Sequence, residues 1–151
     1  ILSVPPRILI DAENVKSFDR RTENFASFET AEGEVVVVNG FTGAVEKITN
    51  PELATDFRNV LAFKAVDENS PDSKFFFVSR DPGSSLGFVS VFDLATGKSR
   101  RLRQLSLLAG PRLWNELSFL PSDTPGKNIL SFSQMDFDGG GATREIFLYG
   151  E

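Results

Sequence analysis

Two short runs of aromatic and β-branched residues, separated by a polar turn, constrain the fold of this chain more than any other feature. Residues 75–79 read Phe-Phe-Phe-Val-Ser and residues 88–92 read Phe-Val-Ser-Val-Phe. Runs of this composition, bounded by turn residues, are typical of a β-hairpin. A Thr-Gly turn at residues 96–97 closes the second run, and a basic segment follows. The chain is therefore predicted to be built from antiparallel hairpins.

The same order of strands and turns recurs along the chain. Residues 33–43, a valine run that ends in Thr42-Gly43, superimpose on residues 87–97, and residues 117–133 align with residues 61–79. A unit of about four strands every 40–55 residues is typical of a β-propeller blade. We therefore predict an all-β fold with propeller-like four-stranded blades, as a single domain over residues 1–151 or as part of a larger propeller. The repeats are expected near residues 24–50, 60–103 and 114–150.

The sequence also predicts the secondary structure of four segments outside the best-matched strands. Residues 7–10 are predicted to form a strand, whereas residues 11–23 are polar and poorly periodic and are predicted to form a loop. Asn50 followed by Pro51 has the residue types of a helix N-cap and first helical position, so a short helix is expected there. In residues 100–108, leucines at three-residue spacing favour one helical or 3₁₀ turn.

Residues 60–149 resemble the blades of TolB-type propellers and of the propellers attached to prolyl-oligopeptidase-like peptidases. The matching positions are Leu61, Phe63, Ser70, Pro71, Asp72, Lys74, Ser79, Arg80, Asp81, Gly83, Asp93, Leu94, Thr96, Gly97 and Leu102. These are turn and strand positions, so the resemblance implies a fold and says little about function. Residues 122–127 depart from the family pattern by an insertion in its Ser-Pro-Asp-Gly-Lys turn.

The number of repeats raises the question of how the ends of the sheet array are covered. Propellers of this family close with six or more blades, and about three repeats would leave two end blades with unpaired apolar faces. We consider three solutions: association of two or more chains, completion of the ring by a second fragment, or a compact β-sandwich or β-barrel. The first two predict a protein partner, as a homo-oligomer or as a second fragment.

Composition excludes several classes of function. The net charge is −5, so the chain lacks the positive potential that nucleic-acid binding requires. It has no His and no Cys, which excludes a His base, a His-ligated zinc or a thiolate from this chain itself. No run approaches the about 18 apolar residues of a membrane-spanning helix. We predict no nucleic-acid partner, no membrane partner and no cofactor.

Three segments resemble parts of catalytic motifs. Residues 83–87 match the Gly-x-Ser-x-Gly nucleophile elbow, but they lie between two predicted strands and the chain has no His. Residues 95–99 resemble the end of a phosphate-binding loop, but Phe92 stands where that loop needs Gly. Both segments are interpreted as hairpin turns. Residues 8–14 resemble the first strand of NYN-type nucleases, whose leading Asp, here Asp11, binds the catalytic metal, against the alternative of a strand that runs into a polar loop.

Two further groups of charged residues are candidate binding sites. Asp136 and Asp138 alternate before a glycine run, as in calcium loops, so they are candidate metal ligands against the alternative of a flexible turn. Arg100, Arg101 and Arg103 form the main basic cluster and are candidates for docking an acidic partner, against the alternative of a solvated strand end.

The sequence supports three hypotheses of function. The first is a non-enzymatic binding or scaffolding module of β-propeller type that acts on a protein or peptide through loops at one end of its strands. The second is the substrate-gating propeller of a serine peptidase whose catalytic domain lies elsewhere, as the family resemblance implies. The third is a small carboxylate-dependent metal enzyme built around Asp11 and Glu13.

Overall fold

A computed structural model describes residues 15–22, 25–66, 74–110, 112–125, 127–139 and 141–150. These residues form three antiparallel sheets and one short helix, so the protein is all-β, as predicted. The described strands close no barrel, so the barrel alternative is wrong. The predicted strand at residues 7–10 and the carboxylates of Asp11 and Glu13 lie outside the described residues.

Each sheet is a meander in which every strand pairs with the next strand along the chain. The N-terminal sheet contains β1 (Val15–Thr22), β2 (Phe25–Thr30), β3 (Val35–Asn39) and β4 (Val45–Lys47). After α1 (Pro51–Arg58), the central sheet contains β5 (Val60–Ala65), β6 (Lys74–Arg80), β7 (Leu86–Asp93) and β8 (Lys98–Ser106). The C-terminal sheet contains β9 (Leu113–Leu120), β10 (Lys127–Asp136) and β11 (Gly141–Gly150).

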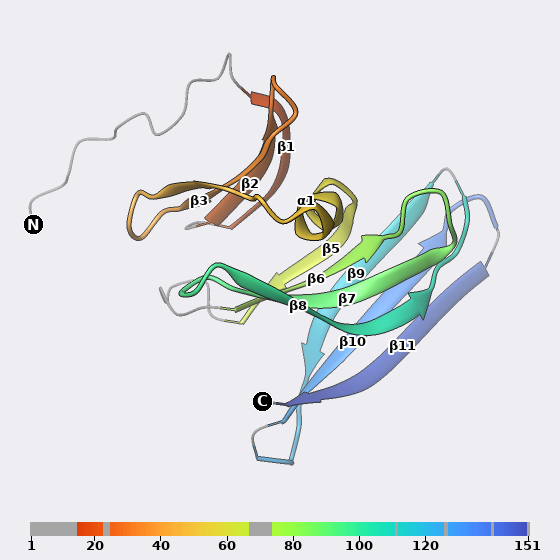
Figure 1. Ribbon diagram of the computed structural model, residues 1–151. Helices are drawn as coiled ribbons and strands as arrows, with labels where there is room; N and C mark the ends of the chain where they lie inside the picture. Colours follow the sequence, from red (N-terminus) through yellow and green to blue (C-terminus); the bar gives the residue numbers. More distant parts are fainter. Residues whose placement is uncertain are drawn as a thin grey trace, which may run out of the picture.

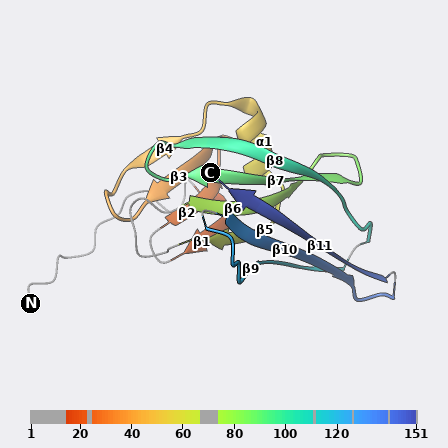
Figure 2. The same ribbon diagram turned by 90° about the horizontal axis from the view of Figure 1, so that it is seen from below.

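The three sheets stack, with the central sheet between the other two (Figures 1 and 2). Strand β5, the first of the central sheet, contacts both β1 and β9, the first strands of its neighbours. In each sheet, the chain therefore starts at the strand that contacts the neighbouring sheets (β1, β5 or β9) and proceeds strand by strand to the far edge. The next sheet then begins beside the first strand of the previous sheet.

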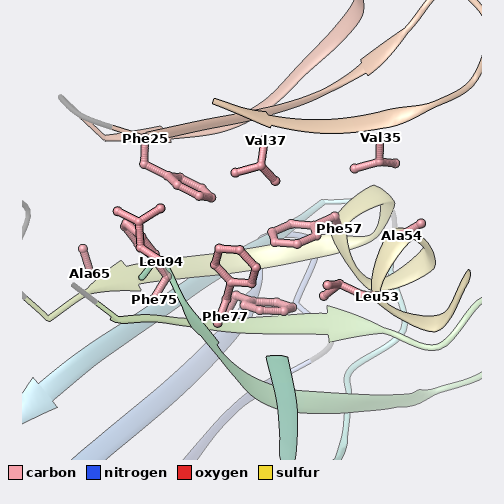
Figure 3. Close-up of a cluster of buried hydrophobic side chains, with 11 residues drawn as sticks. Phe25, Val35, Val37, Leu53, Ala54, Phe57, Ala65, Phe75, Phe77 and Leu94 are labelled. Atoms are coloured by element: carbon pink, nitrogen blue, oxygen red, sulfur yellow. The ribbon is translucent and has the colours of Figure 1, made fainter. Parts of the chain in front are cut away.

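The first core lies between the N-terminal and central sheets and includes helix α1 (Figure 3). Val35 and Val37 point from β3 toward the aromatic rings of Phe57 and Phe77 (Figure 3). The Phe57 and Phe77 rings stack with centroids 5.2 Å apart. This core contains Phe25, Val35, Val37, Leu53, Ala54, Phe57, Ala65, Phe75, Phe77, Phe92 and Leu94. Abundant Phe thus fills the space between two sheets with few, large side chains.

Helix α1 begins as the sequence predicts. The Asn50 side chain accepts hydrogen bonds from the backbone N–H groups of Glu52 and Leu53, at 2.9 and 3.2 Å. Pro51 occupies the first helical position, where its missing N–H costs no helical hydrogen bond. The helix buries Leu53, Ala54 and Phe57, and it thereby covers one end of the first core.

The second core lies between the central and C-terminal sheets. It contains Ala62, Phe76, Val78, Val89, Val91, Leu105, Leu107, Leu117, Leu130 and Phe132. Phe119 packs against it, edge-on to Phe76 at 5.5 Å. Phe119 and Phe132 therefore share a core, since both lie on the same face of the C-terminal sheet.

The runs at residues 75–79 and 88–92 and the valine run lie in β6, β7 and β3, as predicted. Two other expectations are wrong. Residues 11–23 were expected to form a loop, yet β1 occupies Val15–Thr22 and pairs with β2. Two irregularities interrupt that register, at Val15/Ser17 and Phe18/Arg20. The pairing is set by the neighbouring strand, and such a strand has little periodic signal of its own in the sequence.

Residues 100–108 were expected to include a helical turn, yet they belong largely to strand β8. The register against β7 shifts between Val89 and Ser90, whose partners are Arg103 and Arg101, so Leu102 is an extra residue in a bulge. A bulge changes which face the following residues present. Leu102 and Leu105 can therefore pack on the same core despite the three-residue spacing that suggested a helix.

Candidate binding surface at the Thr-Gly turns

The hairpin turns after β3 and β7 have the same construction. In each, a side-chain oxygen of the first residue, Asn39 or Asp93, accepts a backbone N–H two residues on at 2.9 Å. The N–H of Gly43 donates to the Asn39 carbonyl, and that of Gly97 donates to the Asp93 carbonyl, both at 2.8 Å. Gly43 and Gly97 have φ of 74° and 70°, which glycine adopts without steric cost. The predicted equivalence of the two Thr-Gly turns is confirmed.

A hollow of about 310 Å³ lies between these two turns, where the N-terminal sheet stacks on the central sheet. The central sheet contributes Phe92 and Leu94, which are both largely buried, so the floor is apolar. The exposed Glu46 lies at the rim, and a Cβ added at Gly97 would sit 3.6 Å from its Oε2. The hollow is lined by Val37, Asn39, Thr42, Ala44, Glu46, Phe92, Leu94 and Ala95.

A smaller hollow of about 190 Å³ lies on the other side of the β7–β8 turn. It includes three cationic side chains and one carboxylate, so its electrostatic potential is positive, whereas the rim of the larger hollow carries the negative charge of Glu46. Its lining residues are Lys74, Val91, Asp93, Thr96, Lys98, Ser99 and Arg100. The Asp93–Gly97 turn is therefore flanked by an apolar hollow with an acidic rim and by a basic hollow.

The predicted arginine cluster is divided among different surroundings. Arg101 faces α1, where its Nη2 donates to Asp56 at 2.9 Å and its Nε lies 3.6 Å from Glu52. Its guanidinium also lies 3.8 Å above the ring of Phe88. The hydrogen bond that Arg101 donates to Asp56 raises the pKa of Arg101 above its ordinary value, with burial acting in the opposite direction. Arg101 thus anchors helix α1 to strand β8.

The other two arginines lie apart from Arg101. Arg103 faces the C-terminal sheet, where its Nε is 3.9 Å from a carboxylate oxygen of Glu145. Arg100 lines the basic hollow. Strand alternation and the bulge in β8 explain this division, because neighbouring residues of a strand point to opposite faces. Of the three, Arg100 is the residue placed at a candidate binding surface.

Asp136 and Asp138 lie together in the turn after β10. The Asp136 side chain accepts the backbone N–H of Asp138 at 2.8 Å, and its carbonyl accepts that of Gly139 at 3.2 Å. Asp138 lies 3.5 Å from Arg112. Within the described ranges, no group of three or more acidic side chains is placed to hold a metal ion. The contacts of both aspartates are those of a hairpin turn.

The two other catalytic-like segments are also hairpin turns. In the β6–β7 turn, Gly83 has φ of 76° and the Ser84 hydroxyl donates to Asp81 at 3.1 Å. Residues 95–99 run through the Thr96-Gly97 turn into β8. A nucleophile elbow and a phosphate-binding loop both lead into a helix, whereas each of these turns joins two strands.

Searches against protein-family models and curated proteins found no match to this chain. The described residues contain a single helix, α1, which is too short and too polar to cross a membrane. Evidence for function therefore comes from the arrangement of the side chains. Glu46 and Ala44 were not predicted as site residues, because the hollow forms only when turns from two different sheets lie side by side.

Proposed function

We propose that the protein is a non-enzymatic binding module of β-propeller type, with its three sheets as consecutive blades in an open arc. Two features support this proposal: each sheet is a sequential meander, and the first strands β1, β5 and β9 lie next to one another. Blades of a propeller have this construction. Loops and turns at the ends of such sheets are well suited to binding, because a rigid scaffold positions them.

The partner is a protein segment or peptide that inserts a side chain between the two Thr-Gly turns. The hollow of about 310 Å³ carries this proposal, since it combines an apolar floor with a few polar groups at its rim. Phe92 and Leu94 favour an aliphatic or aromatic side chain. Glu46 favours a neighbouring Lys or Arg in the same segment, because opposite charges near an interface set orientation and specificity.

A library of random peptides displayed on phage tests this proposal, with the folded chain as bait. We expect enriched peptides to carry an apolar residue adjacent to Lys or Arg. Ala44→Trp would fill the hollow, and Glu46→Lys would reverse the charge at its rim. Each substitution should weaken binding of an enriched peptide by about tenfold or more in fluorescence anisotropy.

Ala31→Trp is the matched control, because Ala31 is exposed in the β2–β3 turn outside the hollow. It should leave peptide affinity unchanged. Peptides that bind Ala44→Trp and Glu46→Lys as tightly as the unmodified chain would refute this binding surface. So would the enrichment of acidic peptides in place of basic ones.

A further inference from the structure

The C-terminal sheet leaves one face uncovered by the other sheets (Figure 1). Leu117, Leu130 and Phe132 point into the second core, so alternate residues of the same strands point away from it. On that outer face, Trp114, Met135 and Ile146 are 45%, 40% and 55% exposed. This is an unusually apolar set for residues in contact with solvent.

The strand register arranges the outer face in rows that cross β9, β10 and β11. The first row is Trp114, Met135 and Ala142. The second is Glu116, Ser133 and Arg144, and the third is Ser118, Ser131 and Ile146. In each of these three rows, the residue on β9 is the complement of the residue on β11: large against small, acidic against basic, or small against large. A fourth row, Leu120, Ile129 and Leu148, has apolar residues on all three strands.

We propose that this outer face is the docking surface for a second copy of the chain, related by a twofold axis that runs roughly along β10. Such an axis places β9 of one copy over β11 of the other. Trp114 then lies over Ala142, Glu116 over Arg144 and Ser118 over Ile146, and each pairing occurs twice. A twofold interface requires a surface that is complementary to itself, and these rows satisfy that condition.

The shape of the outer face fits the same pairing. A hollow of about 370 Å³ opens beside Trp114 and is lined in part by Ala142, Ser133 and Arg144. The twofold axis brings Trp114 of the second copy over Ala142, and therefore into this hollow. Large aromatic side chains inserted in pockets are the usual anchors of protein interfaces. Ser133 on β10 is small and half-buried, so it allows the two sheets to approach closely at the centre of the face.

The charges on the face are available for this contact. Arg144 is exposed, and its Nε donates to Ser131 Oγ at 2.8 Å, which orients the guanidinium across the face. Glu116 is exposed, and its side chain makes no hydrogen bond or ion pair with any described residue. Pairing it with Arg144 of the second copy gives both groups an opposite charge at a partly desolvated interface.

The size of the face predicts a dimer of moderate strength. Three strands spaced about 4.8 Å apart, with the eight residues of β9, give a face about 14 Å wide and 27 Å long. Two such faces bury about 800 Å² of projected area, and interdigitated side chains add to it, which places the interface among the small, weak and transient complexes. We therefore expect association at micromolar concentration.

At the opposite end of the stack, the described outer-face residues at the centre of β2 and β3 are largely buried. Phe28 and Val36 are cross-strand neighbours that alternate with the core residues Phe25, Val35 and Val37, so they point away from the central sheet. They are nevertheless only 2% and 6% exposed. The described centre of β2 and β3 therefore provides no open apolar patch for a head-to-tail stack of copies. The twofold pairing needs only the C-terminal sheet and does not depend on the proposed peptide-binding function.

Charge reversal tests the pairing by sedimentation velocity and by the emission of Trp114, the one tryptophan of the chain. The unmodified chain should form dimers at micromolar concentration, with a blue shift of tryptophan emission that reverses on dilution. Glu116→Arg or Arg144→Glu should each weaken dimerisation by about tenfold or more, because each places two like-charged pairs in the interface. The double reversal should restore it.

A mixture of the two single variants is the most specific measurement. Under the twofold pairing, one copy then carries two acidic groups and the other two basic groups, so the mixture should form heterodimers although neither variant pairs with itself. Glu32→Arg and Lys98→Glu make the same charge changes at exposed positions off the face and should not alter association. Ile146→Lys is a second disruptive variant that spares the Arg144–Ser131 hydrogen bond.

Two outcomes would overturn the proposal. One is a folded, unmodified chain that remains monomeric throughout the micromolar range. The other is dimerisation that survives both single reversals and Ile146→Lys, or that is lost in them and not regained by mixing or by the double reversal. Circular dichroism of each variant confirms that loss of association is not loss of fold.

Discussion

The central and C-terminal sheets are built from similar strands but bury them differently. In β6 of the central sheet, Phe75, Phe76, Phe77 and Val78 are all 1% exposed or less, because each face of that sheet packs on a core. In β10, Leu130 and Phe132 are buried whereas Met135 is 40% exposed. A continuous apolar run thus marks a strand covered on both faces, and an alternating run marks a strand covered on one.

The largest expected effect distinguishes these two environments directly. Phe77→Ala removes a fully buried ring that stacks on Phe57, so the free energy of unfolding should fall by about 3–5 kcal/mol. Met135→Ala, on the outer face of the C-terminal sheet, should cost less than about 1 kcal/mol in the monomer. Urea titrations at concentrations below dimer formation measure both. Equal losses would mean that the two sheets are buried alike.

The second prediction compares the charged contacts on the two sides of β8. Arg101→Met leaves the buried carboxylate of Asp56 without its guanidinium partner, and it should destabilise the fold by about 1–3 kcal/mol. Arg103→Met removes a longer pair with Glu145, in which no hydrogen bond forms to Oε2, and it should cost less than Arg101→Met, at most about 1 kcal/mol. Thermal unfolding in low and high salt provides the measurement. If Arg103→Met lowered the free energy of unfolding more than Arg101→Met, the contact of β8 with the C-terminal sheet would matter more for stability than its contact with α1.

The smallest expected effect concerns the edge of the central sheet. Gly97 has φ of 70°, so Gly97→Val should destabilise by about 1–2 kcal/mol through backbone strain alone. Ser99→Val, two residues along in β8, introduces a good strand former at an exposed position and should be close to neutral. Gly43→Val should resemble Gly97→Val if the two turns are equivalent in energy as well as geometry. Chemical unfolding of the three variants decides this.

Local sequence patterns were sufficient where a segment's own chemistry determines its conformation. Asn50-Pro51 predicted the start of α1 because capping depends on residues within one turn. Thr42-Gly43 and Thr96-Gly97 predicted equivalent turns because positive φ selects glycine. The Phe and Val runs predicted β3, β6 and β7, since their side chains favour a buried, pleated strand.

Local patterns failed where a neighbouring strand determines the conformation. Strand β1 was expected to be a loop, and it is a strand because β2 offers a row of backbone hydrogen-bonding groups. Leu102 and Leu105 suggested a helical turn, but the bulge against Val89 and Ser90 places them on one face of a strand. In both cases the hydrogen bonds that stabilise the segment come from residues outside it.

The amino-acid sequence by itself determined the all-β class, the hairpin turns, the N-terminus of the helix and the absence of His and Cys chemistry from this chain. The tertiary structure decided which faces of the sheets are covered, how the three neighbouring arginines are divided, and where Ala44, Glu46 and Leu94 form a hollow. Turn and cap conformations follow from steric and hydrogen-bonding preferences within a few residues. Burial and pairing instead depend on segments distant in sequence, whose positions only the packing of the sheets can set.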